Sequence, residues 1–200
     1  MQNNELTDDG LVEGYLNGDI SCFIQLLNRY QARLFNYIYR RTEDKQEAED
    51  IFQEIFYRVI DNLRHYRKEG HFKAWLFKIA FNICVDNARK KKKMILVSMN
   101  QEFATGEAEG ASLEGLITAD SPSPSDSAND KEIQKLLQEA LGCLSREQKE
   151  VLLLHIYGRL SFKEISQVLR CSINTVLARM QYALKHLRNI LDEKGVIDEL

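Results

Sequence analysis

Apolar side chains recur at helical spacing over residues 48–63, and polar side chains recur at the same spacing on the opposite side. The apolar stripe has the period of about 3.6 residues that a core-facing helix requires, and it consists of Ala48, Ile51, Phe52, Ile55, Phe56, Val59, Ile60 and Leu63. The polar stripe consists of Asp50, Gln53, Glu54, Tyr57 and Asp61. Burial explains the apolar side, whereas the polar stripe raises the question of a binding surface.

The same periodicity predicts helices through most of the chain. Besides 48–63, the predicted helices cover residues 11–18, 21–41, 72–93, 130–144, 145–157, 161–169 and 172–187. Ser145 with Gln148, and Ser161 with Glu164, have the form of capping boxes and mark two of the helix starts. No stretch of alternating strand pattern interrupts these helices, so we predict an all-α fold.

Periodicity disappears between residues 97 and 129. This segment is acidic, contains the sequence SPSPSDS with both prolines of the chain, and has no Lys or Arg. Such a composition is typical of a flexible linker, and a structureless stretch of this length is unusual inside one domain. We therefore predict two small helical domains, residues 1–96 and 130–200, joined by a flexible acidic linker over 97–129.

Charge is distributed unevenly along the chain, although its formal net value is only −3. Residues 22–97 contain 16 Lys and Arg against 9 Asp and Glu, whereas residues 98–130 contain 7 acidic and no basic residues. A basic segment beside an acidic one indicates a polyanionic partner for the former better than the overall charge does.

The remaining composition indicates an ordinary cytoplasmic protein. The N-terminal MQNNELTDDG lacks the basic start and apolar run of a secretory signal, and no stretch is apolar for long enough to suggest membrane insertion. The four cysteines are far apart, which favours small buried thiols in a reducing compartment. Neither they nor the four histidines show metal-ligand spacing, so no metal or other cofactor is predicted.

The C-terminal pattern of a short helix, a tight connection at residues 170–172 and a longer helix describes a helix-turn-helix. In that motif the first residues of the second helix meet base edges in the major groove. The candidate DNA contacts are therefore Ser172, Asn174, Thr175, Ala178 and Arg179, with Lys185 further along. Asn pairs well with adenine and Arg with guanine or phosphate. A plain corner of two helices in a bundle would share the pattern without binding DNA.

A second candidate DNA surface lies on the helix predicted from residue 72. Opposite its apolar stripe it carries Lys78, Asn82, Asp86 and Arg89, and basic residues continue to 93. Phosphate neutralisation is the obvious use of such a row. Aromatic rings beside cations suit unpaired bases, which stack on the rings. The full candidate set is Tyr66, His71, Phe72, Lys73, Trp75, Lys78, Asn82, Asp86, Arg89 and Lys90. Trp75 alone is better explained as a core residue.

Three motifs together resemble a known family. In their order and spacing, these motifs are similar to regions 2 and 4 of bacterial RNA polymerase sigma factors of the two-domain extracytoplasmic-function (ECF) group. The motifs are AEDIFQEIF, FKAWLFKIAFNICVDNARKKKK and LSREQKEVLLLHIYGRLSFKEISQVLRCSINTVLARMQYALKHLR. The resemblance covers nearly the whole chain apart from the tail and the linker. It implies a protein that directs promoter-specific transcription initiation for a stress or signal regulon.

The resemblance also implies partners and site residues. Core RNA polymerase would bind through the coiled coil of its β′ subunit and through its β flap, and an anti-sigma factor would inhibit the chain. The β′-binding residues would be Asp50, Gln53, Glu54 and Tyr57. The basic helix and the loop before it would read the minus-ten promoter element, and the helix-turn-helix would read the minus-thirty-five element.

Two departures from the family pattern concern the recognition helix. The pair Leu177-Ala178 stands where the family usually has a polar pair, so base contacts are expected to differ, and Leu177 is assigned to packing. Arg170 stands in the turn where the family often has Gly, which puts the usual turn geometry in doubt because Arg tolerates a positive φ poorly.

Two other functions are compatible with parts of the pattern. A two-domain DNA-binding regulator would keep the helix-turn-helix but would not explain the polar stripe around Asp50. An enzyme could use paired carboxylates such as Glu49 and Asp50 for acid–base chemistry. Those carboxylates lie on an amphipathic helix with no nearby His, Ser or Cys arrangement and no phosphate loop, so we do not expect an enzyme.

Overall fold

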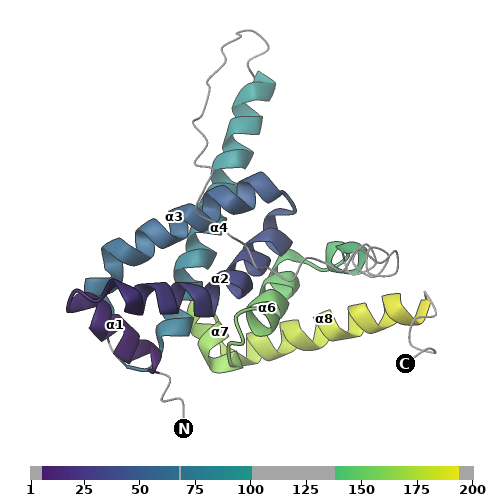
Figure 1. Cartoon of the computed structure of the whole chain (residues 1–200). Coiled ribbons are helices and arrows are strands. Elements are labelled where there is room, and N and C mark those ends of the chain that lie inside the picture. Colours follow the sequence, from purple (N-terminus) through teal and green to yellow (C-terminus); the bar gives the residue numbers. More distant parts are fainter. Residues whose placement is uncertain (1–5, 68, 101–137, 194–200) are drawn as a thin grey trace, which may run out of the picture.

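The computed structural model describes residues 6–67, 69–100 and 138–193, and within these residues every regular element is helical (Figure 1). The elements are α1 (Asp8–Leu16), α2 (Ile20–Thr42), α3 (Lys45–Asn62), the short 3₁₀ helix η1 (Leu63–His65), α4 (Phe72–Asn100), α6 (Arg146–Ile156), α7 (Phe162–Leu169) and α8 (Ile173–Glu193). Residues 138–142 are also helical. The prediction of an all-α fold is confirmed.

Helices α1 to α4 form the N-terminal bundle. Each of the first three begins at a side-chain cap: Thr7, Asp19 and Asp44 accept hydrogen bonds from backbone N–H groups of the first turn. The apolar stripe of α3 packs inward against α2 and α4, with Ile51 and Ile55 almost fully buried. The predicted inner face of α3 is therefore the core face of the bundle, except at Ile60, which is 41% exposed.

Helices α6 to α8 form the C-terminal bundle, and both predicted capping boxes begin its helices. Ser145 and Gln148 cap α6 reciprocally, and Ser161 and Glu164 do the same for α7. Val151, Leu154 and Ile165 are fully buried where these helices meet. Helices α7 and α8, with the turn between them, form the predicted helix-turn-helix.

Arg170 ends α7 in the left-handed conformation, with φ 52° and ψ 46°. Its backbone N–H donates to the Ser166 carbonyl, and the N–H of Cys171 donates to the same oxygen at 3.1 Å. The usual turn geometry is thus kept, and a non-glycine residue adopts it at a cost of about 1–2 kcal/mol.

Part of the predicted packed face of α8 was wrong. The sequence interpretation placed Leu177 there with Ile173 and Leu184, but these residues are 38%, 45% and 53% exposed. The buried line of α8 runs instead through Val176, Met180 and Ala183. Two apolar stripes lie side by side on this helix, and the C-terminal bundle is wide enough to cover only one of them.

Helix α4 continues through Asn100, four residues into the segment predicted as linker. The rest of the predicted linker, and the predicted start of the next helix at Asp130, lie outside the described residues. The first helix begins at Asp8 rather than at residue 11, because Thr7 caps it. The domain boundaries at 96 and 130 therefore stay predictions.

The two bundles pack against each other. Helix α7 contacts α4, and α6 contacts α2, so the C-terminal bundle lies beside the N-terminal end of α4 (Figure 1). This arrangement decides which of the predicted DNA-facing residues are accessible.

Candidate polymerase and nucleic-acid interfaces

The polar stripe of α3 faces away from the core. Asp50 and Gln53 are exposed, and the Tyr57 side chain is 69% exposed. Glu54 is partly exposed and accepts a hydrogen bond from Arg58 at 2.9 Å. The four predicted polymerase-binding residues thus share one accessible surface on a rigid helix, which is suitable for docking on a partner.

Two of the predicted base-stacking rings are core residues in this structure. Tyr66 is 8% exposed and Phe72 is 3% exposed. Their rings pack edge to face with centroids 5.5 Å apart, and Trp75 lies 5.2 Å from Tyr66. The structure corrects the interpretation of Tyr66 and Phe72, because rings enclosed in this way offer no face to a base. The expectation that Trp75 packs with the core agrees with its partial burial.

The loop between η1 and α4 is held by a residue that the sequence did not single out. Asp9 of α1 accepts hydrogen bonds from the Tyr66 hydroxyl and from the Gly70 backbone N–H, both at 2.8 Å. Burial, followed by the bond to Asp9, raises the pKa of Tyr66 well above its usual range. The sequence around Asp9 reads as a helix start, and nothing in its spacing indicates contact with residues 57 and 61 positions away.

Beyond its first turn, α4 has an open surface that carries basic residues. Asn82, Asp86, Arg89 and Lys90 are exposed, and Lys78 is partly exposed. Asp86 and Arg89 lie 3.7 Å apart in a weak ion pair within the helix. The predicted row is therefore present along α4, with one carboxylate inside it.

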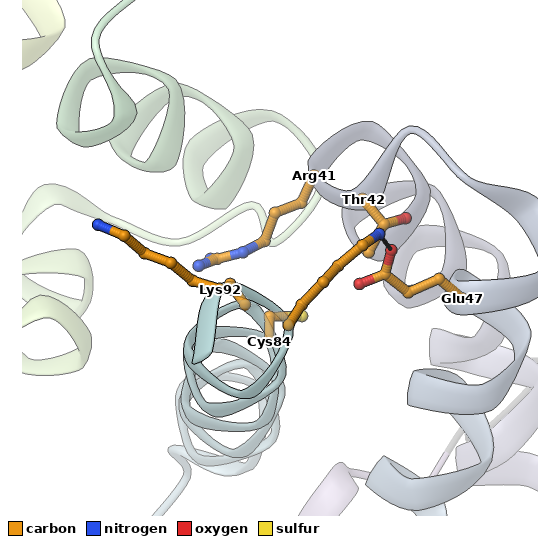
Figure 2. A pocket seen from close by; sticks show the side chains of 7 residues that line it. Arg41, Thr42, Glu47, Cys84 and Lys92 are labelled. Atoms are coloured by element: carbon orange, nitrogen blue, oxygen red, sulfur yellow. Dashed lines mark hydrogen bonds and ion pairs between the residues drawn. The ribbon is translucent and has the colours of Figure 1, made fainter. Parts of the chain in front are cut away.

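A pocket lies where α4 crosses the end of α2 and the start of α3 (Figure 2). Its lining residues are Arg41, Thr42, Glu47, Cys84, Ala88, Lys91 and Lys92. Lys91 bridges to Glu47 at 2.9 Å and so joins α4 to α3. Burial raises the pKa of the Cys84 thiol to about 12, so this thiol is protonated and unreactive at neutral pH.

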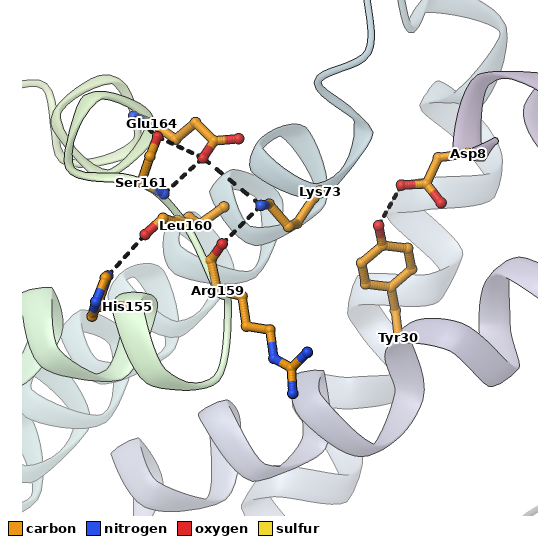
Figure 3. A network of polar contacts seen from close by, with 8 residues as sticks. All are labelled: Asp8, Tyr30, Lys73, His155, Arg159, Leu160, Ser161 and Glu164. Carbon is orange, nitrogen blue, oxygen red and sulfur yellow. Dashed lines mark hydrogen bonds and ion pairs between the residues drawn. The ribbon is translucent and has the colours of Figure 1, made fainter.

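The first turn of α4 is engaged by the C-terminal bundle. Lys73 donates to the carbonyl of Arg159 at 2.8 Å, and its ammonium lies 3.8 Å from the Glu164 carboxylate (Figure 3). Partial burial raises the pKa of Glu164, but hydrogen bonds from Ser161 and the charge of Lys73 outweigh it, leaving that pKa lowered. Lys73, a predicted minus-ten contact, is therefore already bound by the C-terminal bundle.

A buried polar network joins the two bundles behind this contact. The Tyr37 hydroxyl and the Arg41 guanidinium each donate to one oxygen of the Glu150 carboxylate. The side chains of Arg41 and Glu150 are 10% and 7% exposed. Desolvation raises the pKa of Glu150, against the opposing effect of Arg41 and Tyr37. The ion pair gives each of these buried charges an opposite charge as its partner, which an isolated buried charge would lack. Sequence reasoning missed this network because its members are more than 100 positions apart.

The start of the recognition helix α8 is exposed. Ser172 accepts a hydrogen bond from the Thr175 backbone N–H at 3.1 Å and acts as the predicted cap. Asn174, Ala178 and Lys185 are exposed, and Thr175 is partly exposed. Arg179 is partly exposed, with its guanidinium 3.9 Å from the Cys171 sulfur. The structure therefore brings all the predicted minus-thirty-five residues to one helix surface.

The cysteine expectation needs one correction. Cys22 and Cys84 are buried as free thiols, but Cys143 is exposed and Cys171 is partly exposed, because both lie at helix ends. Within the described residues, no cluster of His, Cys, Asp or Glu has the size and geometry of a metal site. Among the described helices, none combines the length and the apolar character needed to span a membrane.

Comparison with protein families identifies both bundles. The chain matches the model for Sigma-70 region 2 over residues 26–94 and the model for Sigma-70, region 4 over residues 134–187. Each match overlaps one bundle, so the resemblance seen in the sequence is confirmed. The chain is a bacterial RNA polymerase sigma factor, a protein that directs promoter-specific transcription initiation.

Similar proteins place it within that class. The chain is 29% identical over 174 residues to the ECF RNA polymerase sigma factor SigW of Bacillus subtilis, which covers 87% of this chain and 91% of SigW. It is 28% identical over 177 residues to the RNA polymerase sigma-H factor of Pseudomonas aeruginosa, covering 86% and 88% of the two chains. The protein belongs to the extracytoplasmic-function group of sigma factors.

Two solved structures share the fold. CnrH, solved in complex with the cytosolic domain of CnrY, superposes with a TM-score of 0.66 at 22% identity, over 94% of this chain and 99% of CnrH. The sigma factor RpoE of Bartonella quintana, solved with the anti-sigma factor NepR, gives a TM-score of 0.64 at 22% identity, over 85% of this chain and 96% of RpoE.

Proposed function

We propose that this sigma factor uses three separate surfaces during initiation. The polar face of α3 binds the β′ coiled coil of core RNA polymerase. The open face of α4, with His71 in the loop before it, holds the melted minus-ten element. The first two turns of α8 read the minus-thirty-five element. The observation that carries this division is that each surface is accessible on a different helix, opposite residues that are buried in its own bundle.

The proposed β′ contact is polar and exposed, which is what a partner released after initiation requires. Obligate interfaces are larger and more apolar than a stripe of Asp50, Gln53 and Tyr57. The C-terminal bundle offers a different surface for the β flap. Leu177 and Leu184 lie seven positions apart on one face of α8 and are 38% and 53% exposed, and exposed apolar groups of this kind mark protein contacts.

Full use of the α4 surface by promoter DNA requires the two bundles to separate. Lys73 is already paired with the Arg159 carbonyl and lies beside Glu164, so a phosphate would have to displace both. The described arrangement is therefore a closed form, and we infer that open complexes contain a chain in which the Arg41–Glu150 pair is broken.

We infer that an anti-sigma factor inhibits this chain. RpoE, which shares its fold, was solved with the anti-sigma factor NepR, and CnrH, which also shares it, was solved with the cytosolic domain of CnrY. A protein that binds both bundles at once would stabilise the closed form, because it favours the arrangement to which it binds. We place the chain in the cytoplasm, where core polymerase works.

No catalytic role is proposed. The carboxylates considered for acid–base chemistry lie on the surface of α3: Glu49 is 3.7 Å from Lys45, and Asp50 accepts a hydrogen bond from Gln46 at 3.4 Å. Both contacts span one turn on the outer side of α3.

The polymerase assignment is tested by pull-down of purified core polymerase. Gln53→Ala and Asp50→Lys should each weaken retention at least roughly tenfold while changing the free energy of unfolding by under about 0.5 kcal/mol. Asp192→Lys is the matched control, because Asp192 is an exposed member of a 4.0 Å helical ion pair on α8. Retention of core polymerase by both α3 variants at the wild-type level would refute the assignment.

A further inference from the structure

The Asp9 carboxylate of helix α1 is hydrogen-bonded to two residues of the loop that precedes α4, the predicted minus-ten loop. One oxygen of Asp9 accepts from the Tyr66 hydroxyl at the start of the loop. The other accepts from the Gly70 N–H near its end. The two donors are four residues apart, so the carboxylate bridges the loop and limits how far its ends can move relative to each other.

The neighbouring residue fixes α1 itself. Asp8 accepts a hydrogen bond at 2.6 Å from Arg29 of α2, and its other oxygen accepts from the Tyr30 hydroxyl (Figure 3). Arg29 also donates to the Leu6 carbonyl at 3.0 Å. Because the first turn of α1 is held on α2 in this way, Asp9 has a fixed position relative to the core. Its hydrogen bonds to Tyr66 and Gly70 therefore hold the loop relative to the core as well.

The loop transmits this position to the start of α4. Tyr66 packs on Phe72 and Trp75, so its ring lies between the loop and the first turn of the helix. Gly70 has φ +72°, a conformation that glycine adopts without strain and that turns its N–H toward Asp9. The next residue, His71, is exposed, and its carbonyl accepts the N–H of Trp75 at 3.0 Å.

We propose that Asp9 is a positioning residue for minus-ten recognition, which sets the positions of Tyr66 and Gly70, and so of the adjoining His71, without touching DNA. The proposal rests on the proposed function of that loop. It predicts that promoter preference depends on a residue of α1, a helix that carries none of the predicted DNA contacts. A purely structural role would instead lower activity at all promoters alike.

The test is transcription by holoenzyme reconstituted with the full chain, on a promoter library randomised at the minus-ten and minus-thirty-five elements. Asp9→Ala should reduce the preference for the best base over the second base by roughly tenfold at one or more minus-ten positions. The minus-thirty-five profile should stay as in the wild type. Tyr66→Phe, which removes one of the two donors and keeps the ring, should give a smaller change in the same direction.

Asp19→Ala is the matched control. Asp19 is a carboxylate of the same bundle that caps α2, where it accepts from the Ser21 N–H at 2.9 Å and from the Cys22 thiol at 3.4 Å. Its replacement should lower thermal stability without changing either profile. A His71→Ala arm separates the two proposals. If His71→Ala shifts the minus-ten profile and Asp9→Ala and Tyr66→Phe do not, the positioning role is refuted. If none of these variants shifts it, the loop does not read the element and the proposed function of this segment fails as well.

Discussion

The two helices predicted to contact DNA differ in how far the rest of the chain covers their DNA-facing residues. The first two turns of α8 are exposed, and the predicted readers there meet solvent. The first turn of α4 is instead partly covered by α7 and by the loop before it, with Lys73 held by the Arg159 carbonyl. The surface predicted to hold melted DNA is therefore restrained by the chain itself, and the surface predicted to read duplex DNA is not.

This difference indicates where regulation can act. Duplex DNA can reach α8 in the closed form, whereas full use of α4 needs the bundles to part. Opening costs the buried Arg41–Glu150 pair and the 2.6 Å contact between Lys149 and Glu43. A partner that supplies alternative contacts for these groups would offset that cost, and core polymerase or an inhibitor would shift the balance in opposite directions.

The largest expected effect comes from removing the restraint on α4. Glu150→Ala leaves the buried Arg41 guanidinium without its carboxylate and should destabilise the closed form by about 3–5 kcal/mol. Small-angle scattering of the free protein should then show a larger radius of gyration than in the wild type. The double variant Arg41→Met with Glu150→Leu removes both charges and should stay compact. An unchanged radius for Glu150→Ala would mean that this pair does not hold the bundles together.

Asn174→Ala tests the open surface. Asn174 lies in the first turn of α8, where a side chain can pair with a base edge, so its loss should cost about 1–3 kcal/mol and relax preference at one minus-thirty-five position. The measurement is holoenzyme affinity for promoters that differ only in that element. A uniform loss across all bases would show that α8 sits in the groove differently.

Arg170→Gly tests how much the left-handed backbone of the turn before α8 costs in stability. Glycine adopts the left-handed conformation without the clash that Arg suffers, so the substitution should stabilise the C-terminal bundle by about 0.5–1 kcal/mol. Thermal unfolding followed by circular dichroism provides the measurement. Arg159→Gly is a useful comparison, because Arg159 also has a positive φ, of 48°, and glycine keeps the backbone carbonyl that accepts from Lys73 at the bundle interface. Destabilisation by Arg170→Gly would show that its side chain contributes more than its backbone costs.

The smallest expected effect concerns Lys185, which lies exposed beyond the first two turns of α8. Lys185→Ala should weaken binding to all promoter sequences about equally and reduce the slope of log affinity against log salt by about one. Titrations at several salt concentrations measure this slope. A change in base preference with an unchanged slope would show that Lys185 contacts a base rather than a phosphate.

The sequence by itself determined the local structure and the class of protein. Helical periodicity predicted most of the elements, and the Ser145–Gln148 and Ser161–Glu164 capping boxes fixed two helix starts, because capping depends only on residues three positions apart. The motifs that resemble sigma regions 2 and 4 gave the family. The exposed polar stripe of α3 was also predictable, since one face of an amphipathic helix must be buried and the other must face outward.

Only the tertiary structure decided which side chains are available. Periodicity placed Leu177 on the packed face of its helix, but the C-terminal bundle is too narrow to cover it. The aromatic character of Tyr66 indicated base stacking, but α1 and α4 enclose its ring. The Asp9 bridge and the Arg41–Glu150 pair join positions 57 to 109 residues apart. Such contacts depend on how helices are placed in space, and a local pattern carries no information about a partner that lies so far along the chain.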